Sequence, residues 1–363
     1  MKRLTPRALP TTLILLAFAL APCAVARQQQ QPARDRGVTA VRRAPAPPRR
    51  AWPERSKRWA LVIGVDEYDD GQISRLGGAA NDARALHDAL VEHAGFPAEQ
   101  VTLLSSTQER GLQPRRNTIL RYLSNLRANV PKDGLLLLAF SGHGIERGGR
   151  AFLLPADAEW SNDVRLLQQT AIEVGAIRDD ISDAGVGQVV LLLDACRNNP
   201  EPGRSGGDNR MTRVFAADFD FAGRNREVVA FAAFYAAAVG ERAYEYRAKG
   251  QGYFTWAVVE GLRGGAANER GEVTLAALAR YVQEKVPRYV QRDLGAEGSQ
   301  RPFSVIEGYL AEELVIAAAA PKSPAAADDA GRLVLEEASL WGAIKDSRSA
   351  ADFEGYLRRY PAG

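Results

Sequence analysis

The chain has 363 residues, of which 46% are hydrophobic and 25% charged. This balance excludes a largely disordered chain, and the length suffices for one large globular domain or two smaller ones. The formal net charge of +3 divides into +3 in residues 1–26, +7 in residues 27–57 and −7 in residues 58–363. Because the basic excess lies before residue 58, we expect no nucleic-acid partner.

The first 26 residues have the three parts of a secretory signal peptide. Basic residues precede an apolar stretch at residues 13–20, and the small residues 24–26 form a cleavage site. The apolar stretch is shorter than the roughly 20 residues that cross a bilayer. We therefore expect signal cleavage, no stable membrane insertion afterwards, and a periplasmic or secreted protein. A retained anchor and a lipoprotein modified at Cys23 are the lesser alternatives.

Residues 27–57 are rich in proline and arginine and predict an extended linker. The following domain, placed at residues 58–315, alternates strand and helix patterns, which is typical of a parallel α/β fold. Asn81 is a candidate cap for its first helix, and Gly95 suits the end of that helix. The strands are expected near residues 59–65, 100–105, 134–141, 187–194, 227–234 and 302–306. The helices are expected near residues 79–94, 116–128, 170–184, 252–263 and 273–290.

Two polar motifs each follow a continuous apolar run. SGHG at residues 141–144 follows LLLLAF, and DAC at residues 194–196 follows VVLLL. Such runs are typical of fully buried parallel strands, and open α/β sheets keep their chemistry at the carboxyl ends of the strands. The sequence therefore predicts that His143 and Cys196 emerge at neighbouring strand ends.

Cys196 is the only cysteine left after signal removal, so no internal disulfide can form. A single free cysteine is often buried and inert. Against that alternative, a polar, turn-prone RNNP segment follows the thiol directly. His143 lies between Gly142 and Gly144, which leave it no apolar packing shell. We therefore expect a reactive thiol and imidazole that meet at a solvent-accessible groove.

These motifs, together with RWALVIGVDEYDD at residues 58–70 and LGGAANDARAL at residues 76–86, resemble the bacterial caspase-like and metacaspase cysteine peptidases. Caspases have the histidine about 50 residues before the cysteine, and here the separation is 53 residues. The resemblance implies an α/β fold, a caspase-like three-layer sandwich with a mostly parallel six-stranded sheet.

The resemblance also implies peptide-bond hydrolysis by a cysteine–histidine dyad. Cys196 would be the nucleophile and His143 the acid and base, with no cofactor required for the chemistry. The backbone amides of Gly144 and Cys196 would form the oxyanion hole. No third residue that orients His143 can be assigned from the sequence.

Metacaspases cleave after arginine or lysine through an acidic pocket, and the matching residues here are Asp82, Ser141 and Asp194. The expected partners are thus protein or peptide substrates with a basic P1 residue, which paired carboxylates recognise well. The alternative is that Asp82 caps its helix and Asp194 only ends a strand. Several metacaspases also need calcium, and the candidate ligands are Asp157, Asp179 and Asp180. A surface acidic cluster without bound metal is the alternative.

Residues 197–226 form a long segment without clear periodicity. In the resembled family this position is often cleaved during maturation, which makes Arg204, Arg210 and Arg213 candidate self-cleavage sites. A solvated insertion is the alternative.

Residues 316–332 read as an Ala/Pro linker, and residues 333–363 as a short helical tail that mediates association or packs on the main domain. For the whole chain, a catalytically silent caspase-like scaffold is the alternative to an enzyme. Retention of both dyad residues argues against a scaffold. The sequence leaves the oligomeric state open.

Overall fold

The structure is a computed structural model. It describes residues 54–195, 230–238, 241–295, 298–308, 312, 314–318, 340–342, 344–345, 347 and 349–359. Several predictions therefore fall outside the described residues: the signal segment, most of both linkers, the thiol of Cys196, and the candidate cleavage sites Arg204, Arg210 and Arg213.

A six-stranded sheet forms the centre of the domain, in the order β12-β8-β7-β3-β1-β2. Every neighbouring pair is parallel except β12 and β8, which are antiparallel. The six predicted strands are confirmed. Their bounds are β1 Arg58–Gly64, β2 Val101–Ser105, β3 Leu135–Ser141, β7 Gln188–Asp194, β8 Ala230–Tyr235 and β12 Phe303–Glu307.

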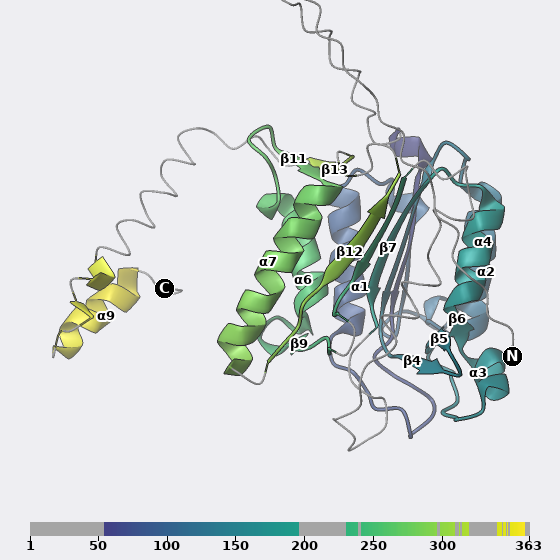
Figure 1. Cartoon of the computed structure of the whole chain (residues 1–363), viewed down its shortest axis with the longest axis horizontal. Coiled ribbons are helices and arrows are strands. Elements are labelled where there is room, and N and C mark those ends of the chain that lie inside the picture. Colours follow the sequence, from purple (N-terminus) through teal and green to yellow (C-terminus); the bar gives the residue numbers. More distant parts are fainter. Residues whose placement is uncertain are drawn as a thin grey trace, which may run out of the picture. The chain divides into compact units, whose positions relative to one another are not determined.

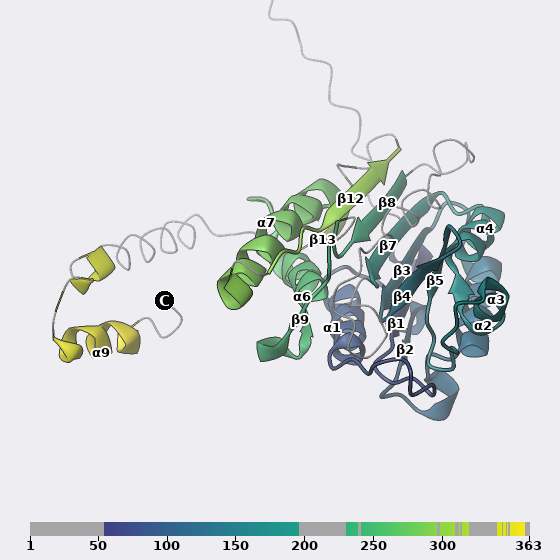
Figure 2. The ribbon, with the colours of Figure 1, turned by 60° about the horizontal axis from the view of Figure 1, so that its bottom comes forward.

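Helices cover both faces of this sheet. Helices α1, α6 and α7 lie on one face, and α2 and α4 lie on the other (Figure 1). The second view gives the same three layers (Figure 2), so the predicted sandwich is confirmed. The bounds are α1 Ala79–Glu92, α2 Arg116–Asn129, α3 Val164–Thr170, α4 Val174–Ala184, α6 Tyr253–Glu260, α7 Leu275–Leu294 and, in the tail, α9 Ala350–Arg359.

The continuous apolar strands explain the layered core. All seven residues of β3 are buried, and so are the last six of β7, as expected for parallel strands that are covered on both faces. Among the helices that the structure describes, none combines the length and the apolar character needed to cross a bilayer.

Three small sheets were not predicted from the sequence. Their strands are β4 Gly144–Arg147, β5 Arg150–Leu153 and β6 Ile172–Glu173; β9 Glu245–Tyr246 and β10 Gln251–Gly252; and β11 Glu272–Thr274 and β13 Val315–Ala318. Short 3₁₀-helices span Arg55–Lys57, Ala98–Gln100, Arg110–Leu112 and Arg247–Lys249, and a π-helical turn spans Gly261–Gly265.

Two of these elements correct the predicted boundaries. One helix was expected at residues 170–184. In the structure, α3 ends at Thr170, the short strand β6 follows, and α4 begins only at Val174. Strand β13 extends the domain to Ala318, because Ile316 and Ala317 are buried and β13 pairs with β11. The linker that was predicted from residue 316 therefore begins later.

The ends of α1 were only partly predicted. Asn81 lies inside the helix and does not cap it. The cap is Asp66, whose carboxylate accepts hydrogen bonds from the backbone N–H groups of Ala79 at 2.7 Å and Ala80 at 2.9 Å. The predicted helix end is confirmed, since Gly95 has a φ of 65° just beyond it.

Candidate active site

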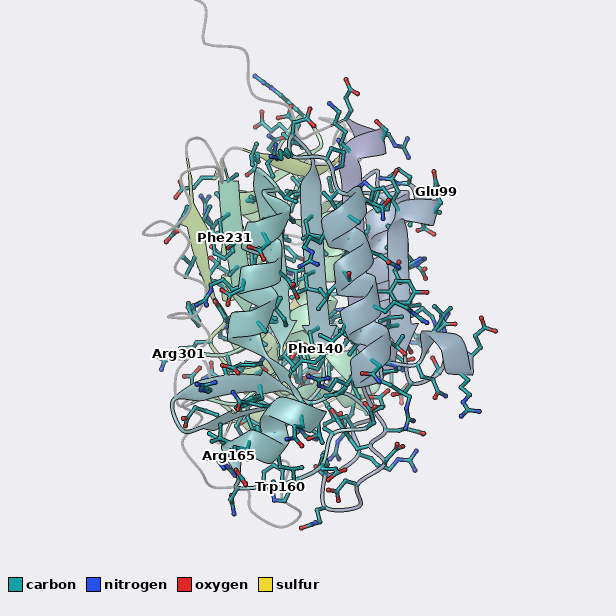
Figure 3. The ribbon with its side chains drawn as sticks, turned by 90° about the vertical axis from the view of Figure 1, so that its right-hand side faces the viewer. Glu99, Phe140, Trp160, Arg165, Phe231 and Arg301 are labelled. Atoms are coloured by element: carbon teal, nitrogen blue, oxygen red, sulfur yellow. The ribbon has the colours of Figure 1, made fainter. Side chains whose placement is uncertain are left out.

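The two sequence motifs leave the sheet at one edge. Strands β3 and β7 end at Ser141 and Asp194, which are register partners, and Gly142 N donates to the Asp194 carbonyl at 3.2 Å. In Figure 3, Phe140 marks the end of β3 and lies toward Trp160, whereas Phe231 lies toward the opposite end of the sheet. His143 and the chain leading to Cys196 therefore start from adjacent strand ends, as predicted.

The imidazole of His143 is held by a backbone carbonyl. Its Nε2 lies 2.8 Å from the Ser74 carbonyl oxygen and 3.3 Å from Ser74 Oγ. Because a carbonyl oxygen can only accept, Nε2 carries the hydrogen in the neutral ring, and Nδ1 carries the lone pair. This geometry gives the ring one tautomer that is suited to act as a base through Nδ1.

Tyr68 covers the same imidazole. Its hydroxyl accepts a hydrogen bond from His143 N at 2.8 Å, and the two ring centroids lie 5.3 Å apart. Gly142 permits this packing, because a Cβ there would lie 2.9 Å from the ring of Phe140 and 3.3 Å from the Tyr68 hydroxyl. The glycine after His143, Gly144, begins β4 opposite Leu153.

The prediction of a solvent-accessible groove around His143 is wrong for this structure. The exposed fraction of His143 is 0%, because Tyr68 and the segment with Ser74 lie against its ring. His143 was also expected to have no apolar packing around it, and this is wrong because Tyr68 packs against its ring. A substrate carbonyl can reach the imidazole only if part of this cover moves.

The segment between β1 and α1 that carries Ser74 is anchored by its own side chains. The Asp70 carboxylate accepts hydrogen bonds from Gln72 N at 2.8 Å and Trp160 N at 2.7 Å. Next to Ser74, Ile73 is buried in a small apolar cluster, separate from the main core, that includes Ile145 of β4. These contacts fix the carbonyl that orients His143.

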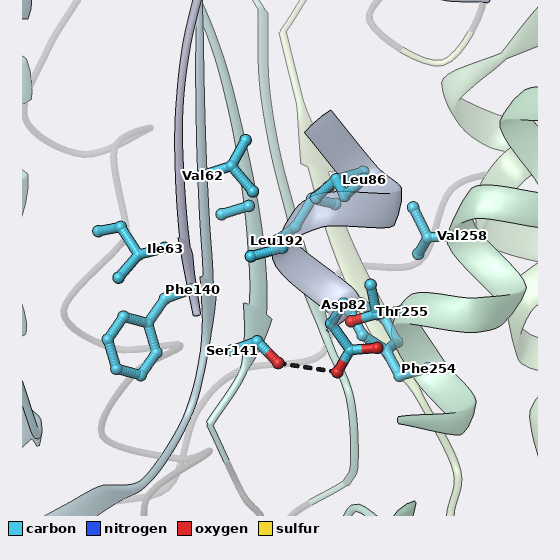
Figure 4. A pocket seen from close by; sticks show the side chains of 12 residues that line it. Val62, Ile63, Asp82, Leu86, Phe140, Ser141, Leu192, Phe254, Thr255 and Val258 are labelled. Carbon is cyan, nitrogen blue, oxygen red and sulfur yellow. Dashed lines mark hydrogen bonds between the residues drawn. The ribbon is translucent and has the colours of Figure 1, made fainter. Parts of the chain in front are cut away.

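The three predicted pocket residues lie close together at the strand ends. Figure 4 shows two of them, Asp82 and Ser141, joined by a hydrogen bond. Asp82 lies in the first turn of α1 with an exposed fraction of 0%. Its Oδ2 accepts a hydrogen bond from Ser141 Oγ at 3.0 Å. Asp194, 2% exposed, follows on the strand next to Ser141.

Both carboxylates take donors from one further segment. Gly252 N donates to Asp82 Oδ1 at 2.9 Å and to Oδ2 at 3.1 Å, and Thr255 Oγ1 donates to Asp194 Oδ2 at 2.8 Å. The alternative that Asp82 caps its own helix is therefore wrong, since Asp66 caps α1 and Asp82 bonds outward. The small pocket around these groups is otherwise apolar, with Val62, Leu86, Leu192, Phe254 and Val258 among its lining residues.

The three candidate calcium ligands have separate partners. Asp157 accepts from Arg116 N at 2.7 Å at the start of α2. Asp179 pairs with Arg178 at 2.7 Å, and Asp180 with Arg127 at 3.2 Å. Within the described ranges, no three or more His, Cys, Asp and Glu residues gather in a way that could hold a metal ion. The structure thus does not assemble these three aspartates into one site.

Four contributors to the site were missed from the sequence. Gly252 acts through its backbone N–H and Ser74 chiefly through its backbone carbonyl. Every residue has these atoms, so the sequence carries no signal for these contacts. Thr255 had a signal in the sequence, because it is the single hydroxyl side chain within the otherwise apolar and aromatic run FTWAVV. Tyr68 follows β1 closely within the segment that resembles the family, but nothing in that segment indicates a contact with His143.

Residues 57–306 match the family model of the caspase domain. The chain therefore belongs to the caspase-domain family of cysteine peptidases.

Its curated relatives include metacaspases. Metacaspase-4 of Arabidopsis thaliana is 35% identical over 85 residues, which are 23% of this chain and 20% of the relative. Metacaspase-1B of Neurospora crassa is 32% identical over 148 residues, 38% of this chain and 33% of the relative. The chain thus spans a third or less of the length of these two relatives. Among solved structures, caspase-1 from Spodoptera frugiperda has a TM-score of 0.45 at 18% identity, covering 70% of this chain and 87% of that one.

Proposed function

We propose that this chain is a cysteine endopeptidase that cleaves peptide bonds after arginine or lysine, with Cys196 as nucleophile and His143 as acid and base. The observation that carries the proposal is a pair of buried carboxylates at the strand ends next to His143: Asp82, which lines a small pocket and bonds Ser141, and Asp194, the register partner of Ser141.

The proposed chemistry uses the tautomer that Ser74 fixes. His143 Nδ1 takes the thiol proton of Cys196, and the thiolate attacks the substrate carbonyl carbon. The backbone amides of Gly144 and Cys196 stabilise the oxyanion. The imidazolium then gives its proton to the leaving amine, and water hydrolyses the acyl-enzyme to release the second product and the free thiol.

The charge of the pocket favours a basic P1 residue. A guanidinium or ammonium group can pair with two carboxylates that are shielded from water, and such charge-assisted hydrogen bonds are the strong ones. An aspartyl P1 side chain would place a third negative charge there without a partner, at a cost of several kcal/mol. The pocket therefore distinguishes substrates by the sign of their charge.

The test measures hydrolysis of fluorogenic peptides with arginine, lysine or aspartate at P1 by the purified full chain. Each peptide is assayed with and without calcium. We expect hydrolysis of the arginyl and lysyl peptides and none with Cys196→Ala or His143→Ala. Faster cleavage of the aspartyl peptide would overturn the specificity. No hydrolysis of any peptide in either condition would favour the catalytically silent scaffold. A difference between the calcium arms tests calcium as an activator.

Asp82→Asn isolates the contribution of one pocket carboxylate. The substitution keeps the shape of the side chain but removes the charge, so we expect kcat/KM for the arginyl peptide to fall about a hundredfold, as for a lost charge-assisted contact of about 3 kcal/mol. Asp88→Asn is the matched control, because Asp88 lies on the same helix with its side chain 49% exposed. Equal activity of the two variants would contradict the role of Asp82.

Two further proposals concern export and maturation of the protein. We propose export after cleavage of residues 1–26, which N-terminal sequencing of the protein from periplasm and medium would test. We also propose self-processing at Arg204, Arg210 or Arg213. A two-fragment product from the wild type, and an intact chain from Cys196→Ala, is the expected result. Fragments in both samples or in neither would exclude self-processing.

A further inference from the structure

Thr255 is the polar side chain of the pocket that neither the motifs nor the proposed mechanism uses. It lies in the first turn of α6, is 5% exposed, and donates from Oγ1 to Asp194 Oδ2 at 2.8 Å. Its helical neighbours Phe254, Ala257 and Val258 are buried and apolar. A buried hydroxyl costs free energy unless it is hydrogen-bonded, and here its partner is a charged group.

The segment at the start of α6 serves both carboxylates. Gly252 N donates to Asp82 and Thr255 Oγ1 donates to Asp194. Gly252 ends β10 and directly precedes α6, and Thr255 lies in the first turn of that helix, so one short segment supplies both donors. In Figure 4, Thr255 lies next to Asp82 and across from Ser141.

This arrangement matters because two buried carboxylates lie near each other at the strand ends. Asp82 and Asp194 are both nearly inaccessible to water, and aliphatic side chains such as Leu192 and Val258 line the pocket beside Asp82. Repulsion between carboxylates is strong where water is excluded. Donors fixed on a helix offset that repulsion and hold each carboxylate in one orientation.

We propose that Thr255 is a specificity-determining residue of this pocket: its hydroxyl orients the carboxylate of Asp194 toward the cationic group of a P1 arginine or lysine. This inference rests on the proposed function. Thr255 touches the carboxylate and not the reacting atoms, so it acts as a positioning residue. It is expected to affect recognition of the P1 charge and to leave the acid–base chemistry of His143 unchanged.

Thr255→Val is the direct test, because valine keeps the shape of threonine and removes only the hydroxyl. The assay compares an arginyl peptide with its citrullinyl analogue, which has nearly the same shape and no charge. We expect the ratio of kcat/KM for arginyl over citrullinyl peptide to fall about tenfold, the equivalent of one lost hydrogen bond to a charged group. The change should appear in KM for the arginyl peptide more than in kcat. Thr255→Ser, which keeps the hydroxyl, should have the ratio of the wild type.

A structural defect would lower the activity on both peptides alike and leave the ratio unchanged. A ratio for Thr255→Val within twofold of wild type therefore overturns the inference, as does a ratio for Thr255→Ser that falls as far as that of the valine variant. Thr255→Ala, assayed in parallel, replaces the valine variant if the latter does not fold. If the wild type cleaves arginyl peptides but Thr255 has no effect, only this inference fails. If the wild type prefers aspartyl peptides, the proposed function fails first.

Discussion

At the scale of single residues, Tyr68 connects the stability of the site to its chemistry. Its hydroxyl accepts from His143 N at 2.8 Å and lies 3.4 Å from the Val65 carbonyl, to which it donates. One hydroxyl thus ties the backbone after β3 to the end of β1, while the ring lies against the imidazole. Together with the Ser74 carbonyl, it fixes both the backbone and the ring of His143.

Tyr68→Phe removes the hydroxyl and keeps the ring. Because His143 N is then left buried without this acceptor, we expect the free energy of unfolding to fall by about 1–3 kcal/mol. We also expect a lower kcat on arginyl peptides with KM nearly unchanged, since the acidic pocket is not touched. Urea unfolding and steady-state kinetics measure both effects, and Tyr122→Phe on α2 is the control. A raised KM with unchanged kcat would contradict a role in positioning His143.

At the scale of elements, the first turn of α1 depends on a carboxylate outside the helix. Gly78, the residue before the helix, has no side chain to cap it, and Asp66 accepts from Ala79 N and Ala80 N instead. Asp66 follows shortly after β1, so this cap ties the helix to the strand that precedes it. The helix in turn positions Asp82, which lies in the same turn.

Asp66→Ala should therefore affect both stability and substrate binding. We expect a loss of about 2 kcal/mol in the free energy of unfolding, the upper end for a lost helix cap, and a raised KM for arginyl peptides because Asp82 is less firmly placed. Chemical denaturation and peptide kinetics are the measurements, with Asp88→Ala in the same helix as the control. If both variants lose the same stability, Asp66 does not act as a cap.

The elements also separate what could be predicted from the sequence from what could not. Five strands of the central sheet were predictable because they are largely buried, mainly apolar runs of five to seven residues; β12 is only half-buried along its whole length. Strands β6, β9 and β10 have two residues each, which is too short for any periodicity. The cap of α1 was missed because Asp66 lies 13 residues before Ala79.

The candidate site also contains residues that the sequence could predict and contacts that it could not. His143 was predicted from a motif that follows a buried strand, and Asp82, Ser141 and Asp194 were assigned from the resemblance to the metacaspases. The burial of His143 was missed because it depends on Tyr68, 75 residues away in sequence. Contacts that join distant segments through a backbone carbonyl or a hydroxyl have no pattern that a sequence could reveal.

At the scale of the whole molecule, the domain extends past the segment that matches the caspase family, which ends at residue 306. Strand β13 pairs with β11, and Ala318 N donates to the His93 carbonyl at 3.2 Å. Ile316 closes an apolar pocket together with Leu90 of α1 and Val258 of α6. The last strand thus completes the helix layer that carries Asp82 and Thr255.

Truncation tests whether β13 belongs to the folded domain. A chain that ends at residue 318 should unfold at the same urea concentration as the full chain, because it keeps every contact of β13. A chain that ends at residue 308 uncovers the pocket below Ile316, so it should lose at least the roughly 2–5 kcal/mol of one deleted buried side chain. It should also cleave arginyl peptides less efficiently, since the uncovered pocket is lined by α1, which carries Asp82, and by α6, which carries Thr255. Equal stability of the two truncated chains would mean that β13 only lies on the surface of a domain that is complete at residue 308.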